Sequence, residues 1–330
     1  MESDPSGTAG RPRATVKVAL LCVLAAGVCL ALVVAGTKLL RIGEPFVDLS
    51  ERSSAVTPGS DTPKDGRLRF AVATIVSAEP TFATYRRLVQ RISRDVGLRE
   101  AFIVPPSYAD ARRALEQRQV DVAFVCTGTY ARASRDGSIK LLVQPEFEEG
   151  LDYRCLFIVP VASRFENIQD LRGAVMAFTD PESNTGCFVP SWMVLNRGED
   201  PRSYFRKIVF TGSHDRSILS VALAAVDAAA VDSLVWESNI RQDPSLARRV
   251  RIVWRSEAFG PPAVVVPVGL DQELERSLQE AFLALDEDEE GRGILSSIGI
   301  KRFVPARPED YETAVRLYDD LERRGGLTWR

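Results

Sequence analysis

Small polar side chains gather in one loop of the second half of the chain, where they could hold an anion. Ser183, Asn184, Thr185 and Gly186 stand between the end of a predicted strand and the start of a predicted helix. Hydroxyl groups and unpaired backbone N–H groups at the first turn of a helix suit a negatively charged ligand, because the helix dipole is positive there. The same residue types also cap helices, so this loop alone leaves simple helix capping as an equal alternative.

Three further side chains could take part in the same chemistry. His214, the only histidine of the chain, lies in a predicted loop between a strand and a helix, and Asp215 could cap that helix. An imidazole can donate a hydrogen bond to an oxyanion in either protonation state. Tyr130 adds a phenolic donor, and Asp232, at a strand end, adds an acceptor for a ligand amine or hydroxyl. Each also has a structural alternative: a surface histidine, a packed aromatic ring or a helix cap.

A catalytic set is poorly supported. Ser213, His214 and Asp215 are neighbours in the chain, so they cannot converge in space as a nucleophile, a base and an orienting group must. Cys187 with His214 is another pair to consider, but a cysteine at a helix start is usually a packed residue. We therefore expect no enzyme activity. Labelling by a thiol-reactive probe that disappeared in His214→Ala would contradict this expectation.

The composition excludes several classes of protein. One histidine and five cysteines without a C-x-x-C spacing exclude a structural zinc site, and no cofactor is expected. A net charge of −3 lacks the basic face that nucleic acid requires. The 45% hydrophobic and 26% charged residues predict a folded protein, and 330 residues suggest about two domains. Cys126, Cys155 and Cys187 follow the membrane segment described below; three cysteines allow at most one disulfide, whose pairing stays open.

The N-terminal region predicts a membrane anchor. Residues 18–37 carry no charge and are numerous enough to cross a bilayer as a helix. Basic side chains precede them, which predicts that residues 1–17 stay in the cytoplasm and that the bulk of the chain is extracytoplasmic. No clear signal-peptidase site follows, so we expect a retained anchor, with a cleaved signal as the alternative. Residues 38–66 would form a linker, because their second half is rich in Ser, Thr, Pro, Gly and Asp.

Beyond residue 66, short apolar runs alternate with helical patterns, which predicts an α/β fold with mainly parallel strands. The expected strands are 67–73, 102–104, 120–125, 174–178, 207–210 and 226–231, and the expected helices are 82–96, 108–119, 188–196 and 217–225. Ligands collect beyond the carboxyl ends of strands in open sheets of this kind. That rule points to residues 126–130 and to residues 232 and 233.

Two extended runs, at 153–161 and 262–268, bracket the second half of this pattern, so the chain would leave one lobe and later return to it. Two crossings would form a hinge. Helices expected at 272–286 and 308–323 would complete the first lobe. The expected boundaries are 67–157 with 262–330 for the first lobe and 158–261 for the second.

Several motifs, in this order, resemble those of a known family. They are DPESNTG followed by Pro190 (180–190), FTGSHDRSI (210–218) and VDAAAVDSLVW (226–236), with weaker support from NIQDLRGAVMAF (167–178). They resemble the phosphate, phosphite and phosphonate binding proteins of ABC importers, which have the type 2 periplasmic-binding fold. The resemblance covers roughly residues 67–322. It implies two α/β lobes joined by a two-strand hinge behind the N-terminal helix.

The resemblance also implies a ligand site. The residues that would contact the ligand are Tyr130, Ser183, Asn184, Thr185, Gly186, His214 and Asp232. The loop hydroxyls and the glycine N–H would receive the phosphonate oxygens, while the tyrosine and the histidine would add donors. The carboxylate of Asp232 would face the amine of an aminophosphonate. Asn184 stands where a second small hydroxyl residue is frequent, and Cys126 stands where glycine is usual.

The function implied is that of a solute-binding protein on the outer side of the cytoplasmic membrane. Its two lobes would close over a small phosphorus oxyanion (phosphonate, phosphite or phosphate), and it would hand this ligand to the permease and ATPase subunits of an ABC importer. The alternative is a membrane-anchored sensing ectodomain that signals through a partner protein without import. A cleaved N-terminus on the mature protein would count against this alternative.

Overall fold

A computed structural model describes residues 66–148, 152–327 and 329, which belong to one compact unit that begins at Thr57. The predicted cytoplasmic segment, the predicted anchor at 18–37 and nearly all of the predicted linker lie outside the described residues. Within the described ranges, every helix is too short or too polar to span a bilayer.

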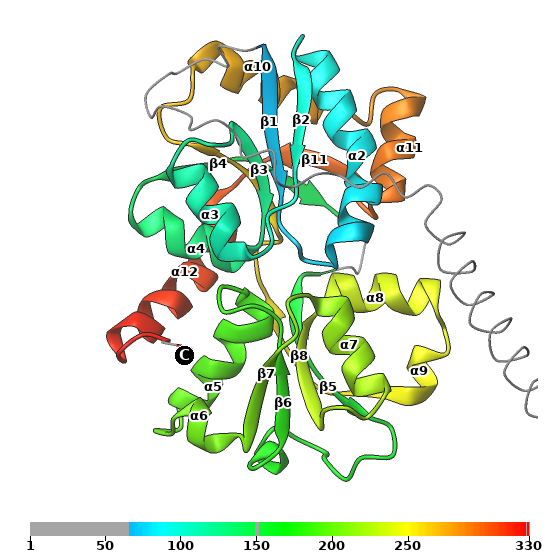
Figure 1. The fold of residues 1–330 in the computed structure, drawn as a ribbon, viewed down its shortest axis with the longest axis vertical. Coiled ribbons are helices and arrows are strands. Elements are labelled where there is room, and N and C mark those ends of the chain that lie inside the picture. The colour runs from blue at the N-terminus through cyan, green and yellow to red at the C-terminus, as the bar shows by residue number, and fades with distance from the viewer. Residues whose placement is uncertain (1–65, 149–151, 328, 330) are drawn as a thin grey trace, which may run out of the picture. The chain divides into compact units, whose positions relative to one another are not determined.

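The first of two lobes is built on a six-stranded sheet in the order β11-β4-β10-β3-β1-β2 (Figure 1). Its strands are β1 (Arg67–Val72), β2 (Arg99–Ile103), β3 (Val122–Val125), β4 (Ile139–Glu146), β10 (Ala263–Pro267) and β11 (Arg302–Pro305). Strand β1 pairs in parallel with β2 and β3, whereas β10 runs antiparallel to β3 and β4, and β11 runs antiparallel to β4.

The second lobe is built on a five-stranded sheet in the order β7-β6-β8-β5-β9. Its strands are β5 (Arg154–Pro160), β6 (Val175–Phe178), β7 (Lys207–Phe210), β8 (Ala228–Asp232) and β9 (Val250–Ala258). Strand β6 is parallel to β7 and β8, and β5 is antiparallel to β8 and β9. The prediction of mainly parallel strands is therefore wrong. Both sheets are mixed: β10 and β11 run against the other strands of the first sheet, and β5 runs against the other strands of the second.

Helices cover the faces of both sheets (Figure 1). In the first lobe they are α2 (Ala78–Asp95), α3 (Tyr108–Glu116), α4 (Thr127–Arg135), α10 (Gln272–Leu283) and α11 (Glu289–Ser297). In the second lobe they are η1 (Gln169–Leu171), the π-helix η2 (Asn184–Phe188), α5 (Val189–Leu195), α6 (Pro201–Tyr204), α7 (His214–Ala222), α8 (Ser233–Gln242) and α9 (Leu246–Arg249). The C-terminal helix α12 (Pro308–Arg323) contacts α4 of the first lobe and α5 of the second.

The chain passes between the lobes after β4 and again after β9. The predicted two-lobed α/β architecture is confirmed, while the lobe boundaries at 157 and 261 stay a prediction. Strand β8 is buried along its whole length, as a strand covered by helices on both faces must be. The strand ends at Asp232, where the two lobes contact each other.

Candidate functional site

Helix N-termini gather where the two lobes meet. Helices α3, α4, η2, α7 and α8 each begin within a few residues of a strand end. Hydrogen bonds bring these ends together across the lobes: the N–H of Tyr108 donates to Asp180 at 3.3 Å, and the N–H of His214 donates to the carbonyl of Ile75 at 3.0 Å. The first N–H groups of a helix lack internal partners, and the dipole is positive there. The positive ends of several helix dipoles therefore lie close together at this crevice.

His214 is the first residue of α7 and is fully buried, so the prediction of a loop position is wrong. The helix begins early because Ser213 takes the extended N-cap conformation. The N–H of Asp232 donates to Nδ1 of the imidazole at 3.1 Å, which assigns the ring proton to Nε2. Nε2 faces the hydroxyl of Ser183 at 3.4 Å. Burial lowers the pKa of His214 to about 3, so the imidazole is neutral at pH 7.

The loop that precedes α5 forms one turn of π-helix, capped by Ser183. The hydroxyl of Ser183 accepts from the N–H of Gly186 at 3.0 Å, so the helix-capping alternative describes its position. Gly186 packs against Thr179, where an added Cβ would lie 2.4 Å from the threonine hydroxyl. Only glycine fits there. In this arrangement the hydroxyl of Ser183 is the partner of both Gly186 and His214.

Other buried polar atoms at the crevice have no hydrogen-bond partner among the described residues. They are Oδ1 and Nδ2 of Asn184, Oγ1 of Thr185, the hydroxyl of Tyr108, Oγ1 of Thr129 and Oγ1 of Thr74. A buried polar group without a partner costs about 1–3 kcal/mol, and few remain in folded proteins. All six atoms belong to first helical turns or to a strand end at the crevice.

Cys126 lies in the middle of this cluster, as the N-cap of α4. Its sulfur lies within hydrogen-bonding reach of the N–H groups of Asn184 and Gly128, and 3.9 Å from the hydroxyl of Tyr153. Burial raises the pKa of Cys126 to about 11, so the group is a thiol at pH 7. An added Cβ on Gly128 would lie 2.6 Å from the nitrogen of Asn184, which shows how closely the two lobes approach here.

The other two described cysteines also lie next to the loop 183–186. The thiol of Cys155 donates to the carbonyl of Thr185 at 3.1 Å, and Cys187 belongs to the π-helix itself; both are buried, and all three cysteines are free. The question of a disulfide, which the sequence left open, is answered for the described residues.

Two tyrosines of the cluster were missed by the sequence reasoning. Burial raises the pKa of both Tyr108 and Tyr153 well above its ordinary value, and the nearby carboxylate of Asp232 contributes to both shifts. Tyr108 begins α3 after β2, so the rule that ligands collect beyond strand ends would have found it. Tyr153 lies in a crossing between the lobes, and no sequence signal marks it.

Asp232 is the N-cap of α8, so its capping alternative is also realised. Its Oδ1 accepts from the N–H of Leu234 at 2.7 Å and of Val235 at 3.4 Å. Burial raises the pKa of this carboxyl to about 7. Asp232 also lines a cavity of about 400 Å³ between the lobes, the only one of the seven predicted site residues that does so.

Tyr130 is the predicted residue that the structure leaves apart from the others. It lies on α4 and is half-buried, with its ring edge-on to Tyr311 at 5.2 Å between centroids. It packs, as Ala114 and Leu141 do, against a buried apolar cluster of the first lobe. The packed-aromatic alternative describes this position.

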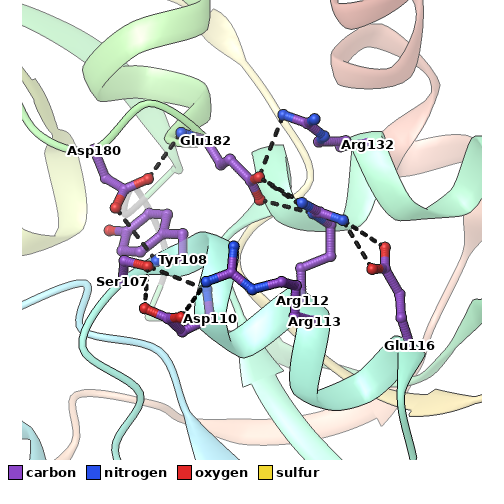
Figure 2. Close-up of polar contacts among 9 residues, drawn as sticks. All are labelled: Ser107, Tyr108, Asp110, Arg112, Arg113, Glu116, Arg132, Asp180 and Glu182. Atoms are coloured by element: carbon purple, nitrogen blue, oxygen red, sulfur yellow. Dashed lines mark hydrogen bonds and ion pairs between the residues drawn. The ribbon is translucent and has the colours of Figure 1, made fainter. Parts of the chain in front are cut away.

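Polar contacts also join the two lobes through Glu182 and Asp180, as Figure 2 shows. Glu182 of the second lobe is 3% exposed and accepts from Nε of Arg112 at 3.2 Å to each oxygen. Nη1 of Arg132 lies 3.3 Å from the same carboxylate. Asp180, two residues earlier, holds the first turn of α3 through the N–H of Tyr108. Burial raises the pKa of Asp180 to about 6. We call these contacts the acidic latch.

A second interlobe contact involves Asp215, which does not cap α7 as predicted. Its two carboxylate oxygens accept from the N–H and the hydroxyl of Ser77, at 3.0 and 2.5 Å. The carboxylate points across the crevice because the N–H of Ser77 has no partner in the first turn of α2. The crevice is thus closed from two sides.

Comparison with known proteins decides the family. Residues 70–311 match the family described as ABC transporter, phosphonate, periplasmic substrate-binding protein. The chain belongs to this family. The predicted resemblance is confirmed, and a member of this family is a binding component and not an enzyme, as expected. The periplasmic location of the family fits the predicted extracytoplasmic domain.

Individual relatives are distant but match over most of their length. A protein named as a probable ABC transporter phosphite binding protein, from Prochlorococcus marinus, is 22% identical over 71% of this chain and 82% of its own. The phosphonates-binding periplasmic protein of Escherichia coli is 20% identical over 78% of each chain. A binding protein component of an ABC phosphonate transporter from Pseudomonas aeruginosa shares the fold at a TM-score of 0.73. It is 20% identical, over 78% of this chain and 87% of its own.

Proposed function

We propose that this protein captures a small phosphorus oxyanion between its lobes and delivers it to the permease and ATPase subunits of an ABC importer. The observation that carries the proposal is the convergence of five helix N-termini and six unpaired polar atoms on one buried crevice. Phosphonate, phosphite and phosphate each present several oxygens that accept hydrogen bonds. The named relatives bind phosphite and phosphonates, which supports the same ligand class here.

The donors proposed for the oxyanion are neutral. Asn184 Nδ2, the hydroxyl of Thr185 and the hydroxyl of Tyr108 are unpaired and buried, so a ligand would gain their hydrogen bonds without displacing protein partners. Ser183, Gly186 and His214 would hold the loop in place, so that the N-terminal end of the π-helix faces the ligand. Asp232 would accept from an amine or hydroxyl on the ligand, and Tyr130 would act only at the edge of the site.

Closure would be linked to binding. A ligand can favour the closed arrangement only through contacts that the open arrangement lacks. The first turns of α3 and α4 come from one lobe and those of η2, α7 and α8 from the other, so a ligand in the crevice touches both lobes. This is the hinge closure expected of a two-lobed binding protein.

We also propose that residues 18–37 remain as a membrane anchor that keeps the binding domain next to its importer. The apolar, uncharged run supports this proposal. Membrane fractionation with N-terminal sequencing of the mature protein would test it. A chain that begins beyond residue 37 would overturn the anchor and leave the ligand proposal untouched. The family is described as an ABC transporter component, which favours import over the sensing alternative.

Calorimetric titration with phosphate, phosphite, methylphosphonate and 2-aminoethylphosphonate tests the ligand class. We expect at least one to bind and sulfate to bind much more weakly. Thr185→Val, which removes an unpaired hydroxyl, should lower the affinity about tenfold, because a hydrogen bond to a charged group contributes about 1.5–3 kcal/mol. Thr211→Val is the matched control, since that hydroxyl is already bonded to Ser217 at 2.6 Å. If none of the four anions binds, the proposal is wrong.

A further inference from the structure

The interlobe cavity reaches from Asp232, at the oxyanion crevice, to the far end of α8. One wall is a face of α8, and the opposite wall is formed by the first turns of α2 and by residues 296–300, at the end of α11 and just after it. The residues of α8 that line it are Leu234, Val235, Ser238, Asn239, Arg241 and Gln242. From Asp232 to Arg241 a helix rises nine residues, or about 13 Å. Its inner end therefore lies at the crevice and its outer end lies one helix length away.

The cavity is much larger than a bare oxyanion needs. Its volume is about 400 Å³, whereas one water molecule takes about 30 Å³ of liquid. Phosphite or phosphate would use only a small part of it. Asp232 belongs to both compartments: its backbone N–H holds His214 at 3.1 Å, and its carboxylate lines the cavity. A substituent on phosphorus would pass this carboxylate to enter the cavity.

The lining changes in character along the cavity. At the inner end, Oδ2 of Asp232 and the hydroxyl of Tyr85 form no hydrogen bond within the described ranges. Between the two ends of α8 the lining is mixed, with apolar side chains such as Phe124 and Val235 beside the polar Ser238 and Asn239. At the outer end Arg241 is exposed, and its guanidinium forms no hydrogen bond or ion pair with any residue that the structure describes. The cavity thus has an acceptor at one end of α8 and a cation at the other.

We infer that the ligand is an organophosphonate whose substituent occupies this cavity and ends in an anionic group, such as a carboxylate, beside Arg241. The inference rests on the proposed function, because the helix N-termini must hold the phosphorus end. Asp215 also lines the cavity, but both of its oxygens are bound by Ser77. The free cation at the outer end therefore selects the terminal group, while apolar side chains such as Val235 and Phe124 accommodate a chain between the two charged ends.

The test is a ligand series titrated calorimetrically into the full-length protein in detergent. Carboxyalkylphosphonates with two to six methylene groups are compared with alkylphosphonates of the same length. We expect the carboxylates to bind more tightly than their uncharged counterparts, with the difference greatest in the longer members. Arg241→Gln should weaken the long carboxylates about two- to fivefold, the range of an exposed ion pair, and leave the alkylphosphonates unchanged. Arg248→Gln, on α9 away from the cavity, is the matched control.

The outcomes separate the two proposals. If methylphosphonate binds but long chains are excluded, or if the carboxylates gain nothing over the alkyl compounds, the inference is wrong and the proposed function stands. The same holds if Arg241→Gln and Arg248→Gln behave alike. If no phosphonate of any length binds, both fail together. An advantage of the carboxylates that shrinks with added salt would support the ion pair.

Discussion

The hydroxyl of Tyr108 is fully buried and has no partner in the described part of the chain. We expect Tyr108→Phe to keep or slightly raise the free energy of unfolding without ligand, because the variant no longer buries an unpaired polar group. The affinity for methylphosphonate should fall about tenfold. Urea denaturation and calorimetric titration measure the two quantities.

Tyr204→Phe is the control for this prediction. Its hydroxyl is also buried but donates to the carbonyl of Ile168 at 3.1 Å, far from the crevice. This variant should lose about 1 kcal/mol of stability and no affinity. Equal losses of affinity in the two variants would show that the hydroxyl of Tyr108 has no special role in binding.

The carboxyl of Asp232 makes stability depend on pH. Its pKa is about 7 in the folded state and near 3.8 in the unfolded chain, so between pH 4 and 7 the folded state binds more protons. Stability therefore falls as pH rises through this window. Asp232→Asn keeps a side-chain oxygen as helix cap but cannot titrate. The free energy of unfolding of the variant minus that of wild type should therefore be larger at pH 8 than at pH 5.

His214 contributes with the opposite sign. Its pKa is lowered from 6.5 to about 3, so the unfolded chain binds more protons between these values and stability rises with pH there. The comparison of Asp232→Asn with wild type cancels this contribution. Urea denaturation at pH 5 and pH 8 measures the stability difference between the variant and wild type. If this difference is the same at both pH values, Asp232 is not a buried carboxyl that titrates between them.

At the scale of helices and loops, the acidic latch should hold the lobes together. Replacing Glu182 by Gln removes the charge that pairs with Arg112 and Arg132 and should weaken the closed arrangement by about 1–3 kcal/mol. Small-angle scattering of the ligand-free protein should then show a larger radius of gyration. Glu116→Gln is the control, because Glu116 pairs with the same Arg112 within α3. An equal effect of both variants would argue against the latch.

Apolar periodicity predicted most of the elements that position the site. The strand at 207–210 and the helix at 308–323 have the predicted bounds, and the strand predicted at 67–73 ends one residue earlier. Strand direction was not predictable, because an apolar run such as β10 reads the same in parallel and antiparallel pairing. The start of α7 was misplaced by three residues because Ser213 was not recognised as its cap.

The contacts between the lobes could not be predicted from the sequence. Arg112 and Glu182 are 70 positions apart, and Ser77 and Asp215 are 138 apart, so no local pattern joins them. The loop 183–186 was found because its residue types differ from those around it. Tyr153 was not, since an aromatic residue beside a strand is ordinary.

For the whole folded unit, α12 connects the two lobes. Tyr318 packs against Phe188 of the second lobe at 5.1 Å between ring centroids, and the guanidinium of Arg135 of the first lobe lies over it at 5.9 Å. Tyr318→Ala should cost about 3 kcal/mol, in the range of large-to-small core changes. Circular dichroism and tryptophan fluorescence should still lose signal together in urea.

The control for α12 is Arg316→Ala. Arg316 lies on the exposed side of the same helix and pairs only with Glu312 within the described ranges, so less than about 0.5 kcal/mol is expected. Separate transitions for the two probes in Tyr318→Ala would mean that the lobes unfold independently once this ring is lost.

The position of Cys126 makes its reactivity a measure of how often the two lobes separate. Its sulfur lies against the N–H of Asn184 from the opposite lobe, whereas Cys187 is fully buried within η2 of the second lobe. We expect a thiol reagent to reach Cys126 when the lobes part and Cys187 only when η2 unfolds. When alkylation is faster than closing, the rate of alkylation at Cys126 equals the rate of opening, and its inverse under saturating ligand is the lifetime of the closed state.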